Sequence, residues 1–306
     1  QKWPDLFNIN MNCAVCWNCL LNDVPTMIIS GSIILKSQSS KNGISKTQSA
    51  GNQRHKTSLV GTSETTRAAT LPTSFCEWLA GVIDGDGCLL VSKKGYTSLE
   101  ITMGIEDLAI LRYIQHMLGG SIKMRSGAKA YRYRLHNKQG MTTLIQNING
   151  HIRHSARLLQ LHRVCQQLNF PVIQPVSLIS TSNWFAGFFD ADGTITMSIK
   201  NLRPQLSIRV VNKHLIDVEW YRTVFGGYIY FDRSQNGYYQ WSVQSREDIM
   251  KMLNYFKSSH FRSHKSQRFF LIDKYFKLYD LQAYKEDSIH HKAWLSFMEK
   301  WNKLKI

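Results

Sequence analysis

The sequence lacks an apolar run long enough to cross a membrane. A bilayer-spanning helix needs about 20 consecutive apolar residues. The apolar stretch at 27–35 is much shorter and is flanked by polar residues. We therefore expect no membrane-spanning helix, and no membrane partner once the motifs described below are considered.

Cysteine is also scarce. Six cysteines among 306 residues cannot form the disulfide framework of a small secreted protein. Cys13, Cys16 and Cys19 form a C-x-x-C-x-x-C run, but no nearby His or Cys offers a fourth metal ligand. We interpret them as reduced thiols in a loose segment, which is consistent with a reducing intracellular compartment.

Acidic residues are few beside the basic ones. The chain has 21 Asp and Glu against 38 Lys and Arg, for a formal net charge of +17. Most of this excess falls in residues 71–306. It favours a polyanionic partner, either nucleic acid or an anionic membrane surface. Charge alone does not choose between these partners.

The composition changes at residue 71. Residues 37–70 are rich in Ser, Thr, Gln, Asn, Gly and Lys without apolar periodicity, so they cannot bury a core. We expect 1–70 to be a flexible polar N-terminal extension. A helix follows, with Ser74 and Glu77 predicted to form a capping box at its start. Apolar side chains at helical spacing continue to Gly85–Gly87, where we expect the helix to end.

The pattern after residue 71 occurs twice. Helix, two strands, helix, two strands and helix follow one another, and the pair Gly119–Gly120 recurs as Gly226–Gly227 at a nearly constant offset. We predict an α+β fold of two pseudo-symmetric αββαββα repeats with antiparallel sheets, at 71–169 and 181–306. Residues 170–180 contain two prolines and form the predicted linker. A C-terminal helix is expected at 289–306.

The first helix of each repeat ends in a similar nine-residue motif. Residues 79–87 read Leu-Ala-Gly-Val-Ile-Asp-Gly-Asp-Gly, and residues 185–193 read Phe-Ala-Gly-Phe-Phe-Asp-Ala-Asp-Gly. Both resemble the signature of the LAGLIDADG family of homing endonucleases and intron maturases. The resemblance covers about residues 74–280 and implies two repeats that form a saddle over duplex DNA.

Small residues in these motifs recur at a spacing of four. That spacing lets two helix backbones approach closely, so we predict that the two helices pack against each other. The expected interface residues are Trp78, Gly81, Gly85, Trp184, Gly187 and Ala191.

Asp86 and Asp192 would then lie side by side at two helix C-termini. Two neighbouring carboxylates repel each other unless a cation lies between them, and a helix C-terminus also attracts cations. Hard oxygen ligands favour Mg²⁺, so we predict two or three Mg²⁺ ions held by Asp86 and Asp192, with Gly85 and Ala191 as further ligands. Such a centre can hydrolyse phosphodiesters. The alternative is that these aspartates only cap helices or bind turn amides. Asp84 and Asp190 are expected to be structural and to hold backbone or a neighbouring helix.

The resemblance implies further catalytic residues. A basic residue usually stands near the scissile phosphate, before the third helix, and Lys265 fits this place in the second repeat. The first repeat has no lysine there and offers His154 or Arg157. A polar residue late in the second strand usually orients water, which assigns Asn212 to that role. The first repeat offers only Ile105 and Glu106 there.

The predicted strands have one apolar and one polar, basic face, because alternate side chains point to opposite sides. Tyr131, Tyr133 and Leu135, and in the second repeat Ile195, Met197 and Ile199, would face the helices. Arg and Gln on the other face can read guanine and adenine in the major groove, although a solvated sheet face has the same pattern. The predicted DNA-binding residues are Lys123, Arg125, Arg132, Arg134, His136, Lys200, Arg209, Arg233, Gln240, Ser242 and Gln244.

Together with these residues, the resemblance implies a monomeric, site-specific, Mg²⁺-dependent double-strand DNA endonuclease encoded by a mobile group I intron. Two alternatives stay open: an RNA-binding maturase that assists splicing of its own intron RNA, and a non-catalytic nucleic-acid-binding protein. The chain begins with Gln1 rather than Met, as in an intron reading frame continuous with an upstream exon. With the resemblance, this favours a mitochondrion, with a chloroplast as second choice.

Overall fold

The computed structural model describes residues 71–234, 236–259 and 261–304. The expected polar extension 1–70 and its cysteine run lie outside these residues. None of the helices in the described part is long and apolar enough to span a bilayer.

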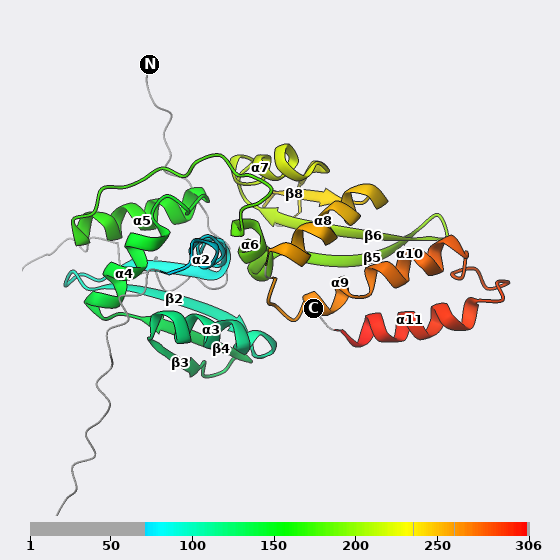
Figure 1. The fold of residues 1–306 in the computed structure, drawn as a ribbon, viewed down its shortest axis with the longest axis horizontal. Coiled ribbons are helices and arrows are strands. Elements are labelled where there is room, and N and C mark those ends of the chain that lie inside the picture. Colours follow the sequence, from blue (N-terminus) through cyan, green and yellow to red (C-terminus); the bar gives the residue numbers. More distant parts are fainter. Residues whose placement is uncertain (1–70, 235, 260, 305–306) are drawn as a thin grey trace, which may run out of the picture. The chain divides into compact units, whose positions relative to one another are not determined.

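The first repeat contains one four-stranded antiparallel sheet and its helices (Figure 1). Its sheet has the strand order β1-β2-β4-β3. Its elements are α2 (Thr73–Asp86), β1 (Gly87–Val91), β2 (Thr97–Gly104), the short 3-10 helix η1 (Ile105–Asp107), α3 (Leu108–Leu118), β3 (Ser121–Met124), β4 (Ala130–Leu135), α4 (Lys138–Ile148) and α5 (Ser155–Leu168).

The second repeat has the same order of elements and the sheet order β5-β6-β8-β7. This confirms the predicted α+β fold of two similar units. The helix expected at 289–306 is present over a shorter range, as α11. The elements are α6 (Trp184–Asp192), β5 (Thr194–Lys200), β6 (Arg203–Asn212), α7 (Ile216–Phe225), β7 (Tyr228–Asp232), β8 (Tyr238–Val243), α8 (Arg246–Ser258), α9 (Ser266–Phe269), α10 (Ile272–Asp280) and α11 (His291–Lys303).

The predicted capping box at the start of α2 is wrong. The helix begins at Thr73, its N-cap is Pro72, and no side chain caps it. Ser74 is therefore already inside the helix. Glu77 instead accepts a hydrogen bond from the backbone N–H of Asn183 at 2.8 Å, so its carboxylate joins the two repeats. Proline suits this start because its fixed φ is close to the helical value.

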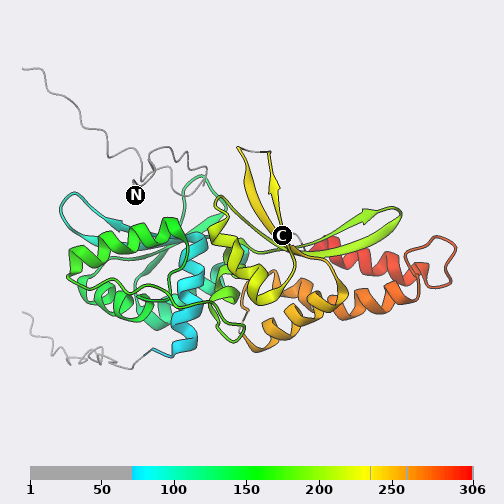
Figure 2. The ribbon, with the colours of Figure 1, turned by 90° about the horizontal axis from the view of Figure 1, so that it is seen from above.

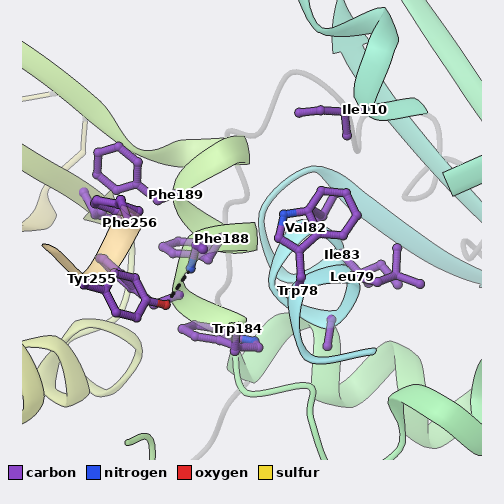
Figure 3. Close-up of a cluster of buried hydrophobic side chains, with 14 of the residues drawn as sticks. Trp78, Leu79, Val82, Ile83, Ile110, Trp184, Phe188, Phe189, Tyr255 and Phe256 are labelled. Carbon is purple, nitrogen blue, oxygen red and sulfur yellow. Dashed lines mark hydrogen bonds between the residues drawn. The ribbon is translucent and has the colours of Figure 1, made fainter. Parts of the chain in front are cut away.

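Each sheet buries one face against helices. Ile101 and Tyr133 in the first sheet and Ile208 and Trp241 in the second have no exposed surface. Figure 3 shows the core on both sides of the α2–α6 contact, with Trp78 and Trp184 close to it. Because both sheets bury one face in this way, the opposite faces are left for other contacts.

One expected core position is wrong. Ile199 was assigned to the helix-facing side of β5, but it is 70% exposed. It pairs with Pro204 next to the hairpin turn at Asn201 and Leu202. Figure 2 shows this β5–β6 hairpin extending from the body of the second repeat. The alternation of the strand continues there, and Ile199 stays exposed although α10 contacts its partner Pro204 through Tyr275.

Candidate functional site

Helices α2 and α6 touch through their backbones. A Cβ atom added to Gly81 would lie 1.9 Å from the Trp184 carbonyl oxygen, and one added to Gly187 would lie 1.8 Å from the Trp78 carbonyl oxygen. A Cβ on Gly85 would lie 2.4 Å from the Cβ of Ala191. These distances leave no room for side chains at the two glycines. The contact therefore depends on glycine at both positions.

Two buried aspartates, each two residues before the end of its motif helix, connect the repeats reciprocally. Trp78 Nε1 donates to Asp190 Oδ2 at 2.9 Å, and Trp184 Nε1 donates to Asp84 Oδ2 at 2.8 Å. Asp84 also accepts the backbone N–H of Arg153 at 2.8 Å. Asp190 in the same way accepts the N–H groups of Arg262 and Ser263. These carboxylates hold the loops before α5 and α9 against the motif helices.

Burial raises the pKa of both carboxyls, and their hydrogen bonds oppose this rise. The pKa of Asp84 is raised to about 7 and that of Asp190 to about 6. Each has its acceptor oxygens occupied by donors of the protein. They are therefore suited to fixing the helix ends rather than to binding a ligand.

Asp86 and Asp192 are the last residues of α2 and α6. A Cβ on Gly85 would lie 3.1 Å from Asp192 Oδ2, so this carboxylate lies against the last turn of α2. Asp86 is half-buried, whereas Asp192 is open to solvent. Protein atoms still surround Asp192 closely enough to raise its pKa, and the positive charges of Lys265 and Arg157 oppose that rise. Two acidic groups and two basic groups therefore meet where the helices end.

The two basic groups occupy equivalent places. Lys265 Nζ donates to the carbonyl oxygens of Asp190 at 3.0 Å and of Ala191 at 2.7 Å. Arg157 donates from Nε to the Ile83 carbonyl at 3.1 Å and from Nη2 to the Gly85 carbonyl at 3.0 Å. Both side chains are buried. Each thus places a positive charge on the negative end of a helix dipole.

Burial and the neighbouring carboxylates act in opposite directions on the pKa of Lys265, which is lowered on balance. Burial lowers the pKa of its ammonium group, whereas the carboxylates of Asp192 and Asp86 raise it. The ammonium group of Lys265 therefore interacts electrostatically with both motif aspartates, Asp86 and Asp192. The geometry therefore joins one cation of the second repeat to acids of both repeats.

His154, which was expected near the scissile phosphate, is buried away from solvent. It is 3% exposed. Its Nε2 lies 2.8 Å from the Tyr221 hydroxyl, and its Nδ1 lies 3.2 Å from Asn212 Nδ2. Burial lowers the pKa of His154 to about 4, so the ring is neutral near pH 7. The expectation for His154 is corrected, because tertiary packing places this ring between the two repeats.

Asn212, expected to orient water, is the hydrogen-bond partner of that histidine. Its Oδ1 also accepts the backbone N–H of His214 at 3.4 Å. It lies at the end of β6 and is half-buried. The structure thus brings Asn212 together with His154, and Arg157 together with the end of α2.

The outer faces of the two sheets carry most of the predicted DNA-binding residues. Arg132 and Arg134 lie on the first sheet, each 3.3 Å from an oxygen of Glu100. Lys123 pairs across strands with Arg132 and is exposed. Arg125, His136 and Arg233 come directly after strands, while Lys200, Arg209, Gln240 and Gln244 lie on or beside the second sheet.

Ser242 does not fit its predicted role. It has no exposed surface, although its side chain belongs to the outer face. It lies between Arg209 and Tyr228 on the adjacent strands, and Gln244 Nε2 donates to its hydroxyl at 3.3 Å. Longer neighbours therefore cover this small side chain.

Two exposed tyrosines on the same face were missed. Tyr228 is 66% exposed and Tyr230 is 47% exposed, and their cross-strand partners are Ser242 and Gln240. Their alternate spacing in a strand was the available signal.

The ends of α2 and α6 offer oxygen ligands suited to a hard divalent cation. The donors are the carboxylates of Asp86 and Asp192 and the carbonyls of Gly85 and Ala191. Each of these two carbonyls also accepts a hydrogen bond from a cationic side chain, Arg157 at Gly85 and Lys265 at Ala191. Within the described residues, no cluster of three or more His, Cys, Asp or Glu side chains could hold a metal. Any ion here would depend on backbone oxygens and on groups of a ligand.

A family model described as LAGLIDADG endonuclease matches residues 79–168 and 185–287, and so includes both motif helices and both sheets. The chain belongs to the LAGLIDADG endonuclease family. It is 45% identical over 263 residues to a probable intron-encoded endonuclease of Debaryomyces hansenii, an alignment that covers 80% of this chain and 40% of that protein.

Another relative is described as an RNA maturase. The chain is 51% identical over 233 residues to an intron-encoded RNA maturase of Saccharomyces cerevisiae, with 74% of this chain and 36% of that protein covered. The chain therefore spans well under half the length of both relatives. Its fold is similar to the homing endonuclease I-SmaMI bound to cleaved DNA, with a TM-score of 0.58 and 17% identity over 76% of this chain and 98% of that one.

Proposed function

We propose that this LAGLIDADG protein is a site-specific endonuclease that cuts both strands of duplex DNA. The observation that carries the proposal is the meeting of Asp86 and Asp192 at the ends of two helices in backbone contact, with Lys265 and Arg157 beside them. The endonuclease relative of Debaryomyces hansenii and the DNA-bound form of I-SmaMI support it.

Divalent cations, with Mg²⁺ as the expected ion and two or three bound, would lower the pKa of an attacking water and stabilise the leaving oxygen. Asp86 and Asp192 would hold these ions, with the carbonyl oxygens of Gly85 and Ala191 as further donors. The aspartates are rigidly placed because the helix contact leaves no room for sliding.

Lys265 and Arg157 would stabilise the negative charge that develops on each phosphate. Both are buried, and a charge in such surroundings interacts more strongly with a ligand than it does in water. We assign Arg157 rather than His154 to this role in the first repeat, because Arg157 contacts the end of α2 whereas His154 does not reach solvent. Asn212 would act indirectly, by holding His154.

The outer faces of the two sheets would bind the duplex. Arg132 and Arg134 suit guanine, and Gln240 suits adenine. The chain would act as a monomer because it contains both repeats. Since both relatives are intron-encoded, we propose an origin in an intron reading frame, in a mitochondrion first and a chloroplast second.

Cleavage of a randomised duplex DNA library with Mg²⁺ tests this function. Asp86→Asn and Asp192→Asn should abolish double-strand cleavage and leave duplex binding unchanged. Asp287→Asn, at an exposed aspartate, is the matched control and should cleave as the wild type does. Full cleavage by either motif variant would contradict the proposal.

Assistance of intron splicing is the second candidate function. It is favoured by the 51% identity to the maturase of Saccharomyces cerevisiae. Splicing of a group I intron RNA in vitro, with the wild type and with Asp86→Asn, separates the two functions. A maturase alone would assist splicing in both forms and would not cut DNA.

A further inference from the structure

A cavity of about 280 Å³ lies in the second repeat, apart from the motif aspartates. It forms where β6 continues past the end of β8, since β6 begins at Arg203 but pairs with β8 only over 208–212. Tyr275 of α10 covers this free stretch, and its hydroxyl donates to the Pro204 carbonyl at 2.8 Å. No residue of α2 or α6 lines the cavity.

The lining is positively charged. Lys200, Arg203 and Arg246 contribute to it, and no carboxylate does. Arg246 is paired with Asp280 at 2.8 Å. Lys200 and Arg203 form no ion pair within the described residues, and they face each other as cross-strand partners. Like charges placed opposite each other destabilise a sheet. An anionic ligand between Lys200 and Arg203 would reduce this repulsion and so stabilise the hairpin.

The hairpin turn holds these two cations together. Asn201 and Leu202, the two residues between them, both have positive φ, at 49° and 61°. This tight turn fixes the register of Lys200 against Arg203. The two charges are therefore a built feature of the fold rather than the ends of a loose loop.

Aromatic rings and amides form the rest of the wall. Tyr275, Phe276 and Tyr279 come from α10, and Tyr279 keeps part of its surface exposed. Gln205 Nε2 donates to Gln244 Oε1 at 2.8 Å, which aligns the two amides. A flat ring would find an aromatic surface here, and its polar edge would find amide groups.

We propose that this cavity binds one unpaired nucleotide of a nucleic-acid strand. The base would lie against Tyr279 with its edge at the glutamine pair, and its phosphate would lie between Lys200 and Arg203. The volume is close to the lower end of about 300–1,000 Å³ for small-molecule sites, so it admits one nucleotide and excludes a base pair. Lys200 and Gln244 also belong to the outer face of the second sheet, so the bound strand would continue onto that face.

Fluorescence anisotropy in EDTA tests the site without cleavage, with short single-stranded RNA, single-stranded DNA and duplex DNA as probes. Arg203→Glu and Tyr279→Ala should each weaken single-strand binding by roughly 10-fold, the effect of losing one stacked base or one phosphate contact. Duplex affinity should fall by less than single-strand affinity, because Lys200 and Gln244 are the cavity residues that also belong to the duplex-binding face. Lys277→Ala, an exposed cation of α10 outside the cavity, is the control and should change neither.

Arg203 is exposed, so its substitution does not threaten folding, and Tyr279→Phe should retain binding because the ring is kept. If single-stranded RNA and single-stranded DNA lose the same affinity in these variants, the base and the phosphate are the recognised groups. Unchanged single-strand affinity in Arg203→Glu would overturn the proposal. Equal losses for single strands and duplex would also overturn it, as would displacement of the RNA by an acidic peptide, which would indicate a general anion site.

Discussion

The two repeats share one framework but present different chemistry on their outer sheet faces. In the first, Arg132 and Arg134 are held by Glu100. In the second, the equivalent part of the face carries Tyr228, Tyr230 and neutral amides. The contact between α2 and α6, by contrast, is nearly symmetric. The two repeats have therefore kept the residues that pack the helices together. Their exposed sheet faces differ because each face contacts different groups.

The symmetric part should be the most sensitive to change. Gly81→Ala and Gly187→Ala each place a methyl group within 1.9 Å of a backbone oxygen. We expect each to destabilise the fold by about 3 kcal/mol or more, measured by urea unfolding. Gly104→Ala is the control, because its new methyl would meet only the movable Glu106 side chain. A large loss of unfolding free energy for one glycine variant and none for the other would show that the two sides of the contact are not equivalent.

The basic groups at the helix ends test whether the repeats are equivalent in activity. Lys265→Met and Arg157→Met should each lower cleavage by about 100-fold, as loss of one charge-stabilising donor does. Duplex DNA labelled on each strand would reveal whether each variant affects a different strand. Arg157→Lys should keep most activity, with melting curves as a check on folding. Normal cleavage of both strands by Arg157→Met would show that only the second repeat uses its cation.

The buried His154 makes the contact between the two repeats sensitive to pH. The pKa of His154 is about 4 in the folded protein and 6.5 when unperturbed. The unfolded chain therefore binds more protons between these values, and the free energy of unfolding falls as pH is lowered through this window. The loss should reach roughly 3 kcal/mol at pH 4.

His154→Gln should remove this part of the pH dependence. Urea unfolding of both proteins from pH 7 to pH 4 measures it, and the difference between their curves cancels the opposite contributions of Asp84 and Asp190. Parallel curves would mean that the imidazole is not held neutral by burial.

The smallest expected effect concerns the divergent faces. Glu100→Gln frees Arg132 and Arg134 from their carboxylate, so duplex binding should tighten by a few-fold and depend more steeply on salt. Tyr228→Ser in the second sheet should weaken binding slightly without changing the salt slope. Binding isotherms at several salt concentrations separate the two. Identical slopes for both variants would remove the distinction between a charged face and an aromatic one.

Local patterns predicted much of this protein, and long-range contacts account for the errors. The helix that carries the second motif was predicted from the repeat, and the structure has it as α6, Trp184–Asp192. The capping box of Ser74 and Glu77 failed because the helix starts earlier, with Pro72 as its N-cap, and the Glu77 carboxylate accepts a hydrogen bond from the distant Asn183. The role given to His154 failed because Tyr221 and Asn212 enclose it. Ser242 was misjudged because neighbouring strands cover it.

The sequence by itself determined the two repeats, their sheets and the pair of acidic motifs, since periodicity and small-residue spacing are local properties. Only the tertiary structure decided that Arg157 stands where Lys265 stands, that His154 is buried, and that a cationic cavity forms beside α10. Each of these depends on which side chains from distant parts of the chain pack together. No single stretch of sequence determines that packing.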